Sequence, residues 1–323
     1  MVMDKLFEIL LEGLEENAGL DEKRKLVNSM LPVHKYTLMQ RFLWEYSWLS
    51  EENRLKCLPI FLDERTKYFD FVQISSNQNT IRHILEIIPR NCPNIETIDL
   101  RGLLITPEIK EFFKTFLKQT TSLKSLRVDC ANYKTNCEIY HLLLENDFDL
   151  LDDDVKTGLL KIEHINGNGF SAAQCARLLK ILPNLKSLGR LQSLDPLLTS
   201  YSNNDDILSK LSKITEFFLH NTNLTALEHF VKYCYNVKML SLWFPGKKVI
   251  ENLWKFPLLT KIKVSADDPE FVSELINLLK KNGKQITYLN LDISNKMRID
   301  YNVLHELCPK LVYLTIMNSI IAD

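Results

Sequence analysis

Residues 167–172 have a spacing that could bind a phosphate group. Gly167, Gly169 and Ala172 match the pattern G-x-G-x-x-A, which in dinucleotide-binding proteins joins a strand to a helix and holds a pyrophosphate on the amino end of that helix. No acidic residue closes the next expected strand, 185–191, where a ribose hydroxyl would need one. The glycines also fall where the chain needs a turn, so we interpret them as turn residues and expect no cofactor.

Other arrangements that carry catalysis or bind metals are missing from the sequence. The seven histidines form no H-E-x-x-H pair, and neither G-x-S-x-G nor G-x-x-x-x-G-K-[S/T] is present. The seven cysteines include no C-x-x-C pair and no zinc ligand set. We therefore predict that the protein is not an enzyme and holds no metal, and that its thiols are reduced.

Composition gives no reason to expect a charged partner such as nucleic acid or an anionic membrane. The 323 residues include 40 lysines and arginines against 41 aspartates and glutamates, for a formal net charge of -1. No stretch approaches 18 uncharged apolar residues, and charges interrupt residues 1–16, so we expect neither a membrane span nor a signal peptide. The composition favours a soluble cytoplasmic protein, which could also be nuclear.

The strongest pattern is a repeated triplet of aliphatic residues, L-x-x-L-x-L. Residues 92–100 and 308–316 both read Cys-Pro-x-L-x-x-L-x-L, where L is any aliphatic residue. The triplet recurs at intervals of mostly 22 to 29 residues, which is typical of a leucine-rich-repeat solenoid. The copies are Phe69/Val72/Ile74, Ile95/Ile98/Leu100, Leu123/Leu126/Val128, Ile214/Phe217/Leu219, Val237/Leu240/Leu242, Leu259/Ile262/Val264, Ile286/Leu289/Leu291 and Leu311/Leu314/Ile316, with weaker ones at Ile162/Ile165/Gly167 and Leu185/Leu188/Arg190.

Each repeat predicts a helix, a turn and a short strand. The last two residues of a triplet lie two apart and so share one face of a strand, while apolar residues spaced by three and four upstream predict a helix. A unit this small cannot bury its apolar face alone. We therefore predict an α/β fold in which about ten irregular repeats, over residues 65–323, stack into a curved parallel sheet with helices outside it.

Three cysteines occupy one position in this repeat, three residues before the first aliphatic residue of a triplet. They are Cys92, Cys234 and Cys308. Cysteine behaves as a small apolar residue when buried, so we predict that these thiols fill the core at the end of a helix.

Residues 1–64 lack the triplet and are predicted to be helical. Leu6, Ile9 and Leu10 begin an apolar stripe, and Ser50 is placed to cap a later helix. The first repeat of a solenoid needs a cover with one apolar and one polar side. We predict that this segment is a small all-α cap.

The repeat period fails between Val128 and Ile162, which predicts an insertion near 133–158. The insertion is acidic and includes Asp152, Asp153 and Asp154. We interpret it as a solvated loop. The alternative is a negatively charged landing site for a basic segment of a partner.

The repeats, with cysteines at their helix ends and an irregular period, resemble the cysteine-containing, ribonuclease-inhibitor-like repeats of F-box/leucine-rich-repeat proteins. In that family a helical F-box docks on the adaptor subunit of a cullin ubiquitin ligase, and the solenoid holds the substrate. The resemblance implies a degenerate F-box within residues 1–64 and a ligase adaptor as a partner. The residues similar to an F-box are Leu31-Pro32, Leu38, Phe42, Leu49-Ser50 and Leu55-Lys56-Cys57.

The outward positions of the predicted strands form columns on the sheet face, and the two halves of the chain differ there. Thr97, Asp99, Ser125 and Arg127 make the first half polar. The second half places aromatic residues and methionine beside lysines, which is typical of a protein-binding hot spot. Coverage by a loop, or a register shifted by one residue, is the alternative. The predicted binding residues are Phe218, Met239, Trp243, Lys261, Lys263, Tyr288 and Tyr313.

The sequence as a whole predicts a non-catalytic module for protein–protein interaction. The family resemblance implies an F-box-like substrate receptor of a cullin-type ubiquitin ligase, which binds its target on the concave face of the repeats. The alternatives are a leucine-rich-repeat scaffold or inhibitor with no link to ubiquitin and, of a different class, an enzyme that uses the turn at Gly167.

Overall fold

The computed structural model divides into two compact units, Met1–Ile162 and Glu163–Asp323. Strands β1 to β10 follow one another in chain order, and a helix precedes each of them. The model describes residues 2–12, 19–45, 50–71, 77–100, 106–127, 151–166, 170–191, 195–220, 224–268, 270–294 and 299–319.

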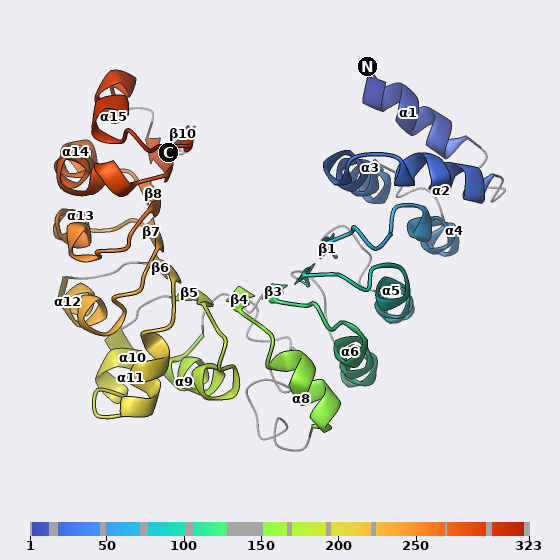
Figure 1. The fold of residues 1–323 in the computed structure, drawn as a ribbon, viewed down its shortest axis with the longest axis horizontal. Coiled ribbons are helices and arrows are strands. Elements are labelled where there is room, and N and C mark those ends of the chain that lie inside the picture. The colour runs from blue at the N-terminus through green and yellow to red at the C-terminus, as the bar shows by residue number, and fades with distance from the viewer. Residues whose placement is uncertain are drawn as a thin grey trace. The chain divides into compact units, whose positions relative to one another are not determined.

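Four helices and a 3-10 turn open the first unit, as the sequence predicts (Figure 1). Gly19, before the second helix, has a φ of 66°, a left-handed conformation that glycine adopts without a steric penalty. The Ser50 hydroxyl accepts a hydrogen bond from the Asn53 amide and caps the fourth helix. These elements are α1 (Val2–Leu11), α2 (Leu20–Asn28), α3 (Pro32–Glu45), α4 (Glu51–Cys57) and η1 (Leu58–Ile60).

The first unit continues with strands and helices that alternate along the chain. The three strands pair in parallel, and Phe69, Ile98 and Leu126 lie side by side in the buried row. The predicted apolar stripe of the helix before β2 is buried, with Ile81, Ile84, Leu85 and Ile88 among its buried residues. The elements are β1 (Tyr68–Asp70), α5 (Gln78–Asn91), β2 (Thr97–Asp99), α6 (Pro107–Gln119), β3 (Ser125–Arg127) and α8 (Asp153–Leu159).

One predicted triplet, Phe69/Val72/Ile74, is in the wrong register. The prediction makes Phe69 the first residue of a triplet. In the structure, Phe69 pairs with Ile98, which is the second residue of the triplet Ile95/Ile98/Leu100. Phe69 and Phe71 are both fully buried and take the second and third places of the repeat. Aromatic rings fill the positions that the aliphatic pattern reserves for leucine, because both residue types supply apolar volume to the same row. Residues 72–76 lie outside the described part of the chain.

The acidic residues predicted to lie in a solvated loop begin a helix instead. Asp153 and Asp154 form the first turn of α8, where negative charge is favourable, and Asp152 is ion-paired with Lys118 at 2.6 Å. Helix α8 packs against α6 so closely that a Cβ at Gly158 would lie 2.6 Å from a backbone oxygen of α6. It is therefore the helix of the next repeat. The remainder of the predicted insertion, 133–150, lies outside the described residues.

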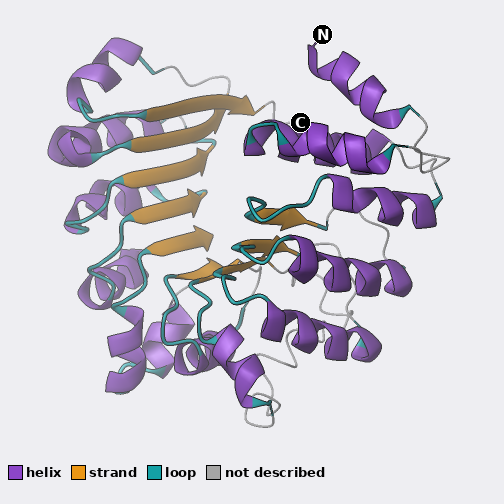
Figure 2. Ribbon diagram, turned by 45° about the vertical axis from the view of Figure 1, so that its right-hand side comes forward, coloured by secondary structure: helices purple, strands orange, loops and turns teal. Residues whose placement is uncertain are grey.

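The described residues of the second unit form seven parallel strands, and helices α12 to α15 lie on one side of strands β6 to β10 (Figures 1 and 2). Its first half comprises β4 (His164–Asn166), α9 (Ala172–Ile181), β5 (Ser187–Leu191), α10 (Asp195–Ser200), α11 (Asp205–Leu211), β6 (Glu216–His220), α12 (Leu224–Tyr233) and β7 (Met239–Trp243). Its second half comprises α13 (Lys247–Asn252), η3 (Leu253–Lys255), β8 (Lys261–Ala266), α14 (Phe271–Asn282), η4 (Gly283–Gln285), β9 (Tyr288–Ser294), α15 (Tyr301–Leu307) and β10 (Tyr313–Ser319).

The predicted triplets from residue 214 onward are confirmed in register. Phe217 pairs with Leu240, and Leu219 pairs with Leu242. The same two rows continue without a shift through β8, β9 and β10. Side chains in both rows are buried from β6 to β9, so each strand contributes two apolar residues to one continuous core.

Strand β5 carries one extra residue, which explains why its triplet looked weak. Ser187 pairs with Glu216, but Arg190 pairs with Phe218, so three steps along β5 match two along β6. Gly189 has a φ of 73°, which provides the bend of a bulge. Leu191 consequently takes the third place of the triplet, where the sequence pattern had placed Arg190.

The repeated cysteines close a helix and open the turn that follows it. The Cys92 amide donates to Ile88 O at 2.7 Å, and the Cys92 carbonyl accepts from the Ile95 amide at 3.1 Å. Cys234 and Cys308 make the same two bonds, and all three are buried. Burial raises the pKa of the Cys92 thiol to about 11, which keeps it protonated and unreactive at neutral pH.

Candidate protein-binding surface

Strands β6 to β10 arrange the predicted binding residues in three columns. Neighbours in a column occupy paired positions on adjacent parallel strands. We call these fifteen positions the β6–β10 face. The columns are Glu216, Met239, Lys261, Tyr288 and Tyr313; Phe218, Ser241, Lys263, Asn290 and Thr315; and His220, Trp243, Ser265, Asp292 and Met317.

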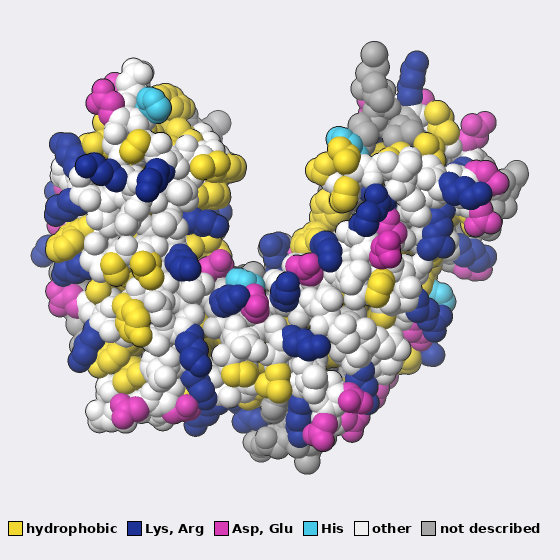
Figure 3. All heavy atoms as spheres, in the orientation of Figure 1, with side chains coloured by type: hydrophobic (Ala, Val, Ile, Leu, Met, Phe, Trp, Pro, Cys, Tyr) yellow, Lys and Arg dark blue, Asp and Glu magenta, His cyan; other side chains and the backbone are white. Residues whose placement is uncertain are grey.

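The predicted residues are less exposed than the sequence suggested. Lys261 is exposed and the Tyr313 side chain is 46 % exposed, whereas the other five, including Phe218 and Trp243, are only partly exposed. The columns themselves are as predicted. Figure 3 shows hydrophobic side chains beside lysine or arginine along the part of the second unit that Figure 1 labels β7 to β10.

The rings of Tyr288 and Tyr313 form a stacked pair on this face. Their centroids are 4.5 Å apart and their planes differ by 4°. The Asn290 amide Nδ2 donates to the Tyr288 hydroxyl at 3.4 Å. An aromatic pair of this kind contributes about 0.5–1.5 kcal/mol beyond area burial, so the two rings present a firm apolar surface.

The two lysines of β8 have no partner within the described part of the chain. Among the described residues, no hydrogen bond or ion pair involves the ammonium group of Lys261 or Lys263. The carboxylate nearest in register, Asp292, accepts a hydrogen bond from the Ser265 hydroxyl at 3.3 Å. Glu216, at the start of the first column, lies 3.6 Å from His164. The positive charge on β8 is therefore not neutralised within the described face.

One surface residue was missed by the sequence prediction. Phe244, directly after β7, is 44 % exposed and has a φ of 49°, a strained conformation for a bulky residue. Its amide donates to Ser265 O at 2.8 Å, and its ring lies edge-on to His220 at 6.3 Å. The outward columns of the repeat do not include this position. The following Pro245-Gly246 was the only signal of a turn there.

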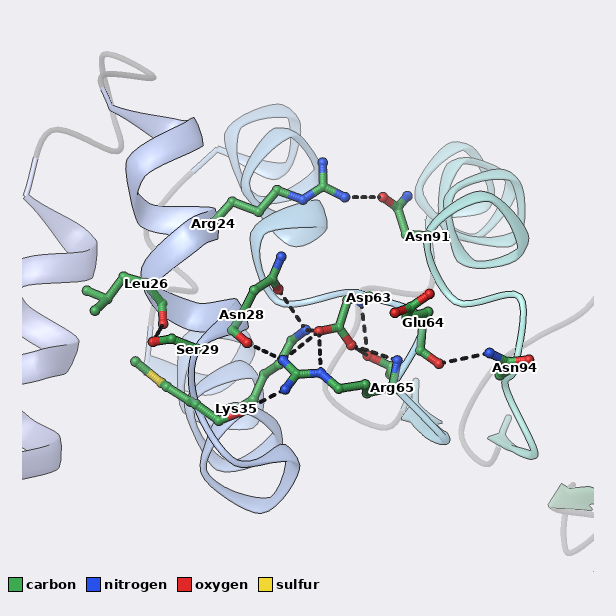
Figure 4. Close-up of polar contacts among 12 residues, drawn as sticks. Arg24, Leu26, Asn28, Ser29, Lys35, Asp63, Glu64, Arg65, Asn91 and Asn94 are labelled. Atoms are coloured by element: carbon green, nitrogen blue, oxygen red, sulfur yellow. Dashed lines mark hydrogen bonds and ion pairs between the residues drawn. The ribbon is translucent and has the colours of Figure 1, made fainter.

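The N-terminal helices of the first unit are held by a buried ion pair (Figure 4). Lys35 Nζ on α3 lies 2.6 Å from Asp63 Oδ2, with the lysine side chain 4 % exposed. Arg65 bonds the same carboxylate at 2.9 Å and also the backbone oxygen of Asn28 on α2. Burial raises the pKa of Asp63, but hydrogen bonds from Lys35 and Arg65 outweigh it and leave the pKa lowered.

The residues that resemble the start of an F-box lie at the beginning of α3. Leu31 is 64 % exposed and Val33 is 62 % exposed, and Pro32 between them is exposed as well. Cys57, from the end of the resemblance, is fully buried. Leu49 lies outside the described residues. Among the described residues of the resemblance, the exposed apolar part is therefore at the amino end of α3.

The polar residues on the strands of the first unit bond to one another. Asp70, Asp99 and Arg127 occupy paired positions, and the Tyr68 hydroxyl lies 3.3 Å from a carboxylate oxygen of each aspartate. Arg127 lies 3.5 Å from Asp99, whose side chain is fully buried although the sequence placed it on the outer surface. Burial and the two carboxylates raise the pKa of Tyr68, which remains a donor at neutral pH.

A pocket of about 170 Å³ lies beside this cluster in the first unit. Tyr36 and Tyr68, whose rings meet edge-on at 5.3 Å, contribute to its wall together with Phe61. Its charged residues are already paired with other side chains: the Asp63 cluster described above, and Lys67, which lies 3.1 Å from Glu96. The pocket therefore presents mainly aromatic and apolar surface.

The glycine turn of the sequence is only partly described, since residues 167–169 lie outside the described part of the chain. The helix that follows it is capped by its own side chains. The Ser171 hydroxyl accepts a hydrogen bond from the backbone N–H of Gln174 at 3.3 Å. The side-chain oxygen of Gln174 accepts one from the backbone N–H of Ser171 at 2.8 Å. This capping box uses two backbone N–H groups that an anion would need.

Across the described ranges, no group of three or more histidine, cysteine, aspartate or glutamate side chains could hold a metal ion.

None of the helices in the described part of the chain combines the length with the apolar character needed to cross a bilayer.

Comparisons with known proteins find only remote similarity. No family model and no curated protein matches the sequence. Among solved structures, the leucine-rich-repeat-containing protein LegL7 from Legionella pneumophila is 15 % identical, with 83 % of this chain and 87 % of that chain covered and a TM-score of 0.44. The TLR13–ssRNA13 complex is 14 % identical with a TM-score of 0.28, and the match covers 80 % of this chain but 39 % of that one. Because these TM-scores are below 0.5, the repeat fold is assigned from the strands and helices of this chain and not from the comparisons.

Proposed function

We propose that the chain is a non-catalytic protein-interaction module whose partner docks on the β6–β10 face. The observation that carries this function is the register of that face, which brings Tyr288, Tyr313 and Trp243 together with two lysines that have no partner in the described part of the chain. A large apolar side chain left in water adds nothing to folding, whereas buried aromatic anchors dominate the energy of protein interfaces.

The face is also well suited to binding because it is rigid. Strands β7, β8 and β9 are paired along both edges, and the row of side chains beneath them is buried. A surface held in this way loses little conformational entropy when a partner binds. Phe244 adds an aromatic ring at one end of the face.

The finer function that we propose is an F-box-like substrate receptor of a cullin-type ubiquitin ligase, which acts in the cytoplasm or the nucleus. Its support is the sequence resemblance together with the exposed Leu31, Pro32 and Val33 at the start of α3. A short apolar surface on a helix that is anchored by the Lys35–Asp63 pair could dock on an adaptor without unfolding the repeats.

The alternative is a scaffold or inhibitor in which the N-terminal helices are only a cap. The observation that favours it is the direct bonding of these helices to the first repeat. Arg65 joins α2 to the segment before β1, and Arg24 on α2 donates to Asn91 on α5 at 3.0 Å. A cap requires such contacts and needs no partner of its own.

Reconstitution separates these two functions. We expect the purified protein to comigrate with the adaptor and cullin subunits on a sizing column, and Leu31→Asp/Val33→Asp to abolish comigration. Leu258→Asp is the matched control, because Leu258 is 44 % exposed and lies in a turn of the second unit. Failure of the unaltered protein to comigrate would leave the scaffold or inhibitor as the function.

A second experiment tests the β6–β10 face itself. Proteins captured from cytosol by the unaltered chain are compared with those captured by Trp243→Ala and by Trp254→Ala. Trp254 is 43 % exposed and lies in η3, away from the columns. We expect a specific partner to be lost with Trp243→Ala and retained with Trp254→Ala. Equal capture by the two variants would contradict docking on this face.

A further inference from the structure

The unpaired positive charge of β8 indicates what kind of partner fits the β6–β10 face. Lys261 and Lys263 lie two residues apart on one strand and therefore project from the same side of the sheet. Neither ammonium group has a counter-ion among the described residues. Two like charges at this spacing repel each other, and an anion from a partner would relieve that repulsion.

The surroundings of the lysines make an ion pair there stronger than one in open solvent. Lys261 lies between Met239 and Tyr288 in its column, and Lys263 lies between Ser241 and Asn290. Once a partner covers these side chains, water is excluded and the local dielectric falls, so that attraction between opposite charges rises.

A buried amide beside the lysines lacks a hydrogen-bond donor. Asn290 is 8 % exposed, and its Oδ1 has no partner among the described residues. That oxygen has less than 1 Å² of accessible surface, so it is closed to a bound chain. The Tyr288 hydroxyl accepts from Asn290 Nδ2, so its own proton is available to an incoming oxygen.

We infer that the partner presents an acidic protein segment to the β6–β10 face, with a carboxylate next to an apolar side chain. The carboxylate accepts hydrogen bonds from Lys261, Lys263 and the Tyr288 hydroxyl. The neighbouring apolar side chain packs against the Tyr288–Tyr313 pair. This inference rests on the proposed function and specifies its partner.

Charge on the same face favours a protein segment over a nucleic acid. Glu216 lies in the same column as Lys261, two strands away, and Asp292 lies in the third column, beside Ser265. A polynucleotide carries a phosphate at every step and gains affinity from many lysine and arginine contacts, so it would meet both carboxylates. A peptide with one or two acidic side chains avoids them.

A labelled random copolymer of glutamate and tyrosine is a suitable probe, because it offers carboxylates beside aromatic rings. We expect it to bind the full chain at low ionic strength by fluorescence anisotropy and to weaken as salt is added. A copolymer of lysine and tyrosine should not bind. Tighter binding of a thymidine oligonucleotide than of the glutamate–tyrosine copolymer would overturn the inference.

Charge reversal at the lysines locates the interaction. Lys261→Glu/Lys263→Glu should weaken copolymer binding by about tenfold or more. Lys280→Glu/Lys284→Glu changes the net charge equally, but these exposed lysines lie in α14 and η4, and we expect a change of less than about twofold. Equal losses in the two double variants would show attraction to net charge alone and would overturn the inference.

The same assay distinguishes failure of this inference from failure of the proposed function. If Trp243→Ala weakens copolymer binding and Lys261→Glu/Lys263→Glu does not, the face binds protein without the charge contact, and only the inference falls. If neither variant matters, or if the unaltered chain does not bind the copolymer, the inference falls, and capture with Trp243→Ala decides the proposed function.

Discussion

The strands of the two units use equivalent repeat positions in opposite ways. In the first unit, Tyr68, Asp99 and Arg127 find their polar partners in each other, and Asp99 is fully buried. In the second unit, Lys261 and Lys263 have no partner among the described residues. The same repeat can therefore form one face whose polar groups bond to each other and another face whose charged groups are available to a ligand.

This difference leads to opposite expectations for substitutions. Removing a polar group from the first unit should cost stability and leave binding intact, because its interactions are intramolecular. Removing a side chain from the β6–β10 face should cost binding with less effect on folding.

Asp63→Asn should have the largest effect, because it leaves the Lys35 charge buried without its partner. We expect a loss of about 3–5 kcal/mol in the free energy of unfolding, measured by urea denaturation. Glu52→Gln is the control, since it breaks a solvent-exposed pair with Lys56 and should leave the free energy of unfolding nearly unchanged. Similar losses in the two variants would mean that the buried pair does not hold the N-terminal helices.

The same carboxylate should make stability depend on acid pH. The pKa of Asp63 is lower in the folded chain than its value of about 3.9 in the unfolded chain, so its contribution is present above that value and is lost as pH falls through the lowered pKa. The stability difference between the unaltered chain and Asp63→Asn should therefore shrink in acid. Denaturation at a series of pH values measures it, and a difference that grows in acid would contradict the lowered pKa.

Asp99→Ala should cost about 2–3 kcal/mol of stability, because the bonds to Arg127 and Tyr68 are lost. Partner capture should not change, since the cluster belongs to the first unit. If Asp99→Ala abolished partner capture without lowering stability, the binding surface would lie on the first unit, which is the opposite of what we expect.

Trp243→Ala should weaken partner binding by about 2 kcal/mol, as expected for an aromatic anchor at an interface. The tryptophan is only partly exposed, so a small loss of stability is expected as well. Titration calorimetry with the captured partner and a melting curve measure the two effects. A sharp fall in melting temperature with unchanged affinity would assign Trp243 to the core.

Tyr313→Ala should have the smallest effect. Its ring is 46 % exposed and stacks on Tyr288, so binding should weaken by about 1 kcal/mol and stability by no more than the value of one aromatic pair. Val312→Ala, at a residue that is 88 % exposed and outside the columns, should change neither quantity. A larger binding loss at Val312 than at Tyr313 would move the interface off the columns.

The repeat and most of its register could be read from the sequence because each strand buries two residues spaced by two. That spacing is a direct consequence of strand geometry, and it holds from Ile214 to Ile316 without a shift. The cysteine positions follow from the same regularity, since one small apolar residue fits each helix end.

The failures lie where a local feature overrides the period. Phe69 carries an aromatic ring into an aliphatic position, and Gly189 adds a bulge that shifts β5 by one residue. Phe244 adopts a positive φ that a bulky residue avoids unless the surrounding structure imposes it. The burial of Asp99 also could not be read from the pattern, because it depends on partners brought close by other strands.

Hydroxyl-radical footprinting of the chain with and without its captured partner tests the central assignment most directly. We expect oxidation to fall at Met239, Trp243 and Tyr313 in the complex and to stay unchanged at Tyr36 and Tyr68 of the first unit. Protection at Tyr36 and Tyr68, with Met239, Trp243 and Tyr313 oxidised as in the free chain, would contradict binding on the β6–β10 face.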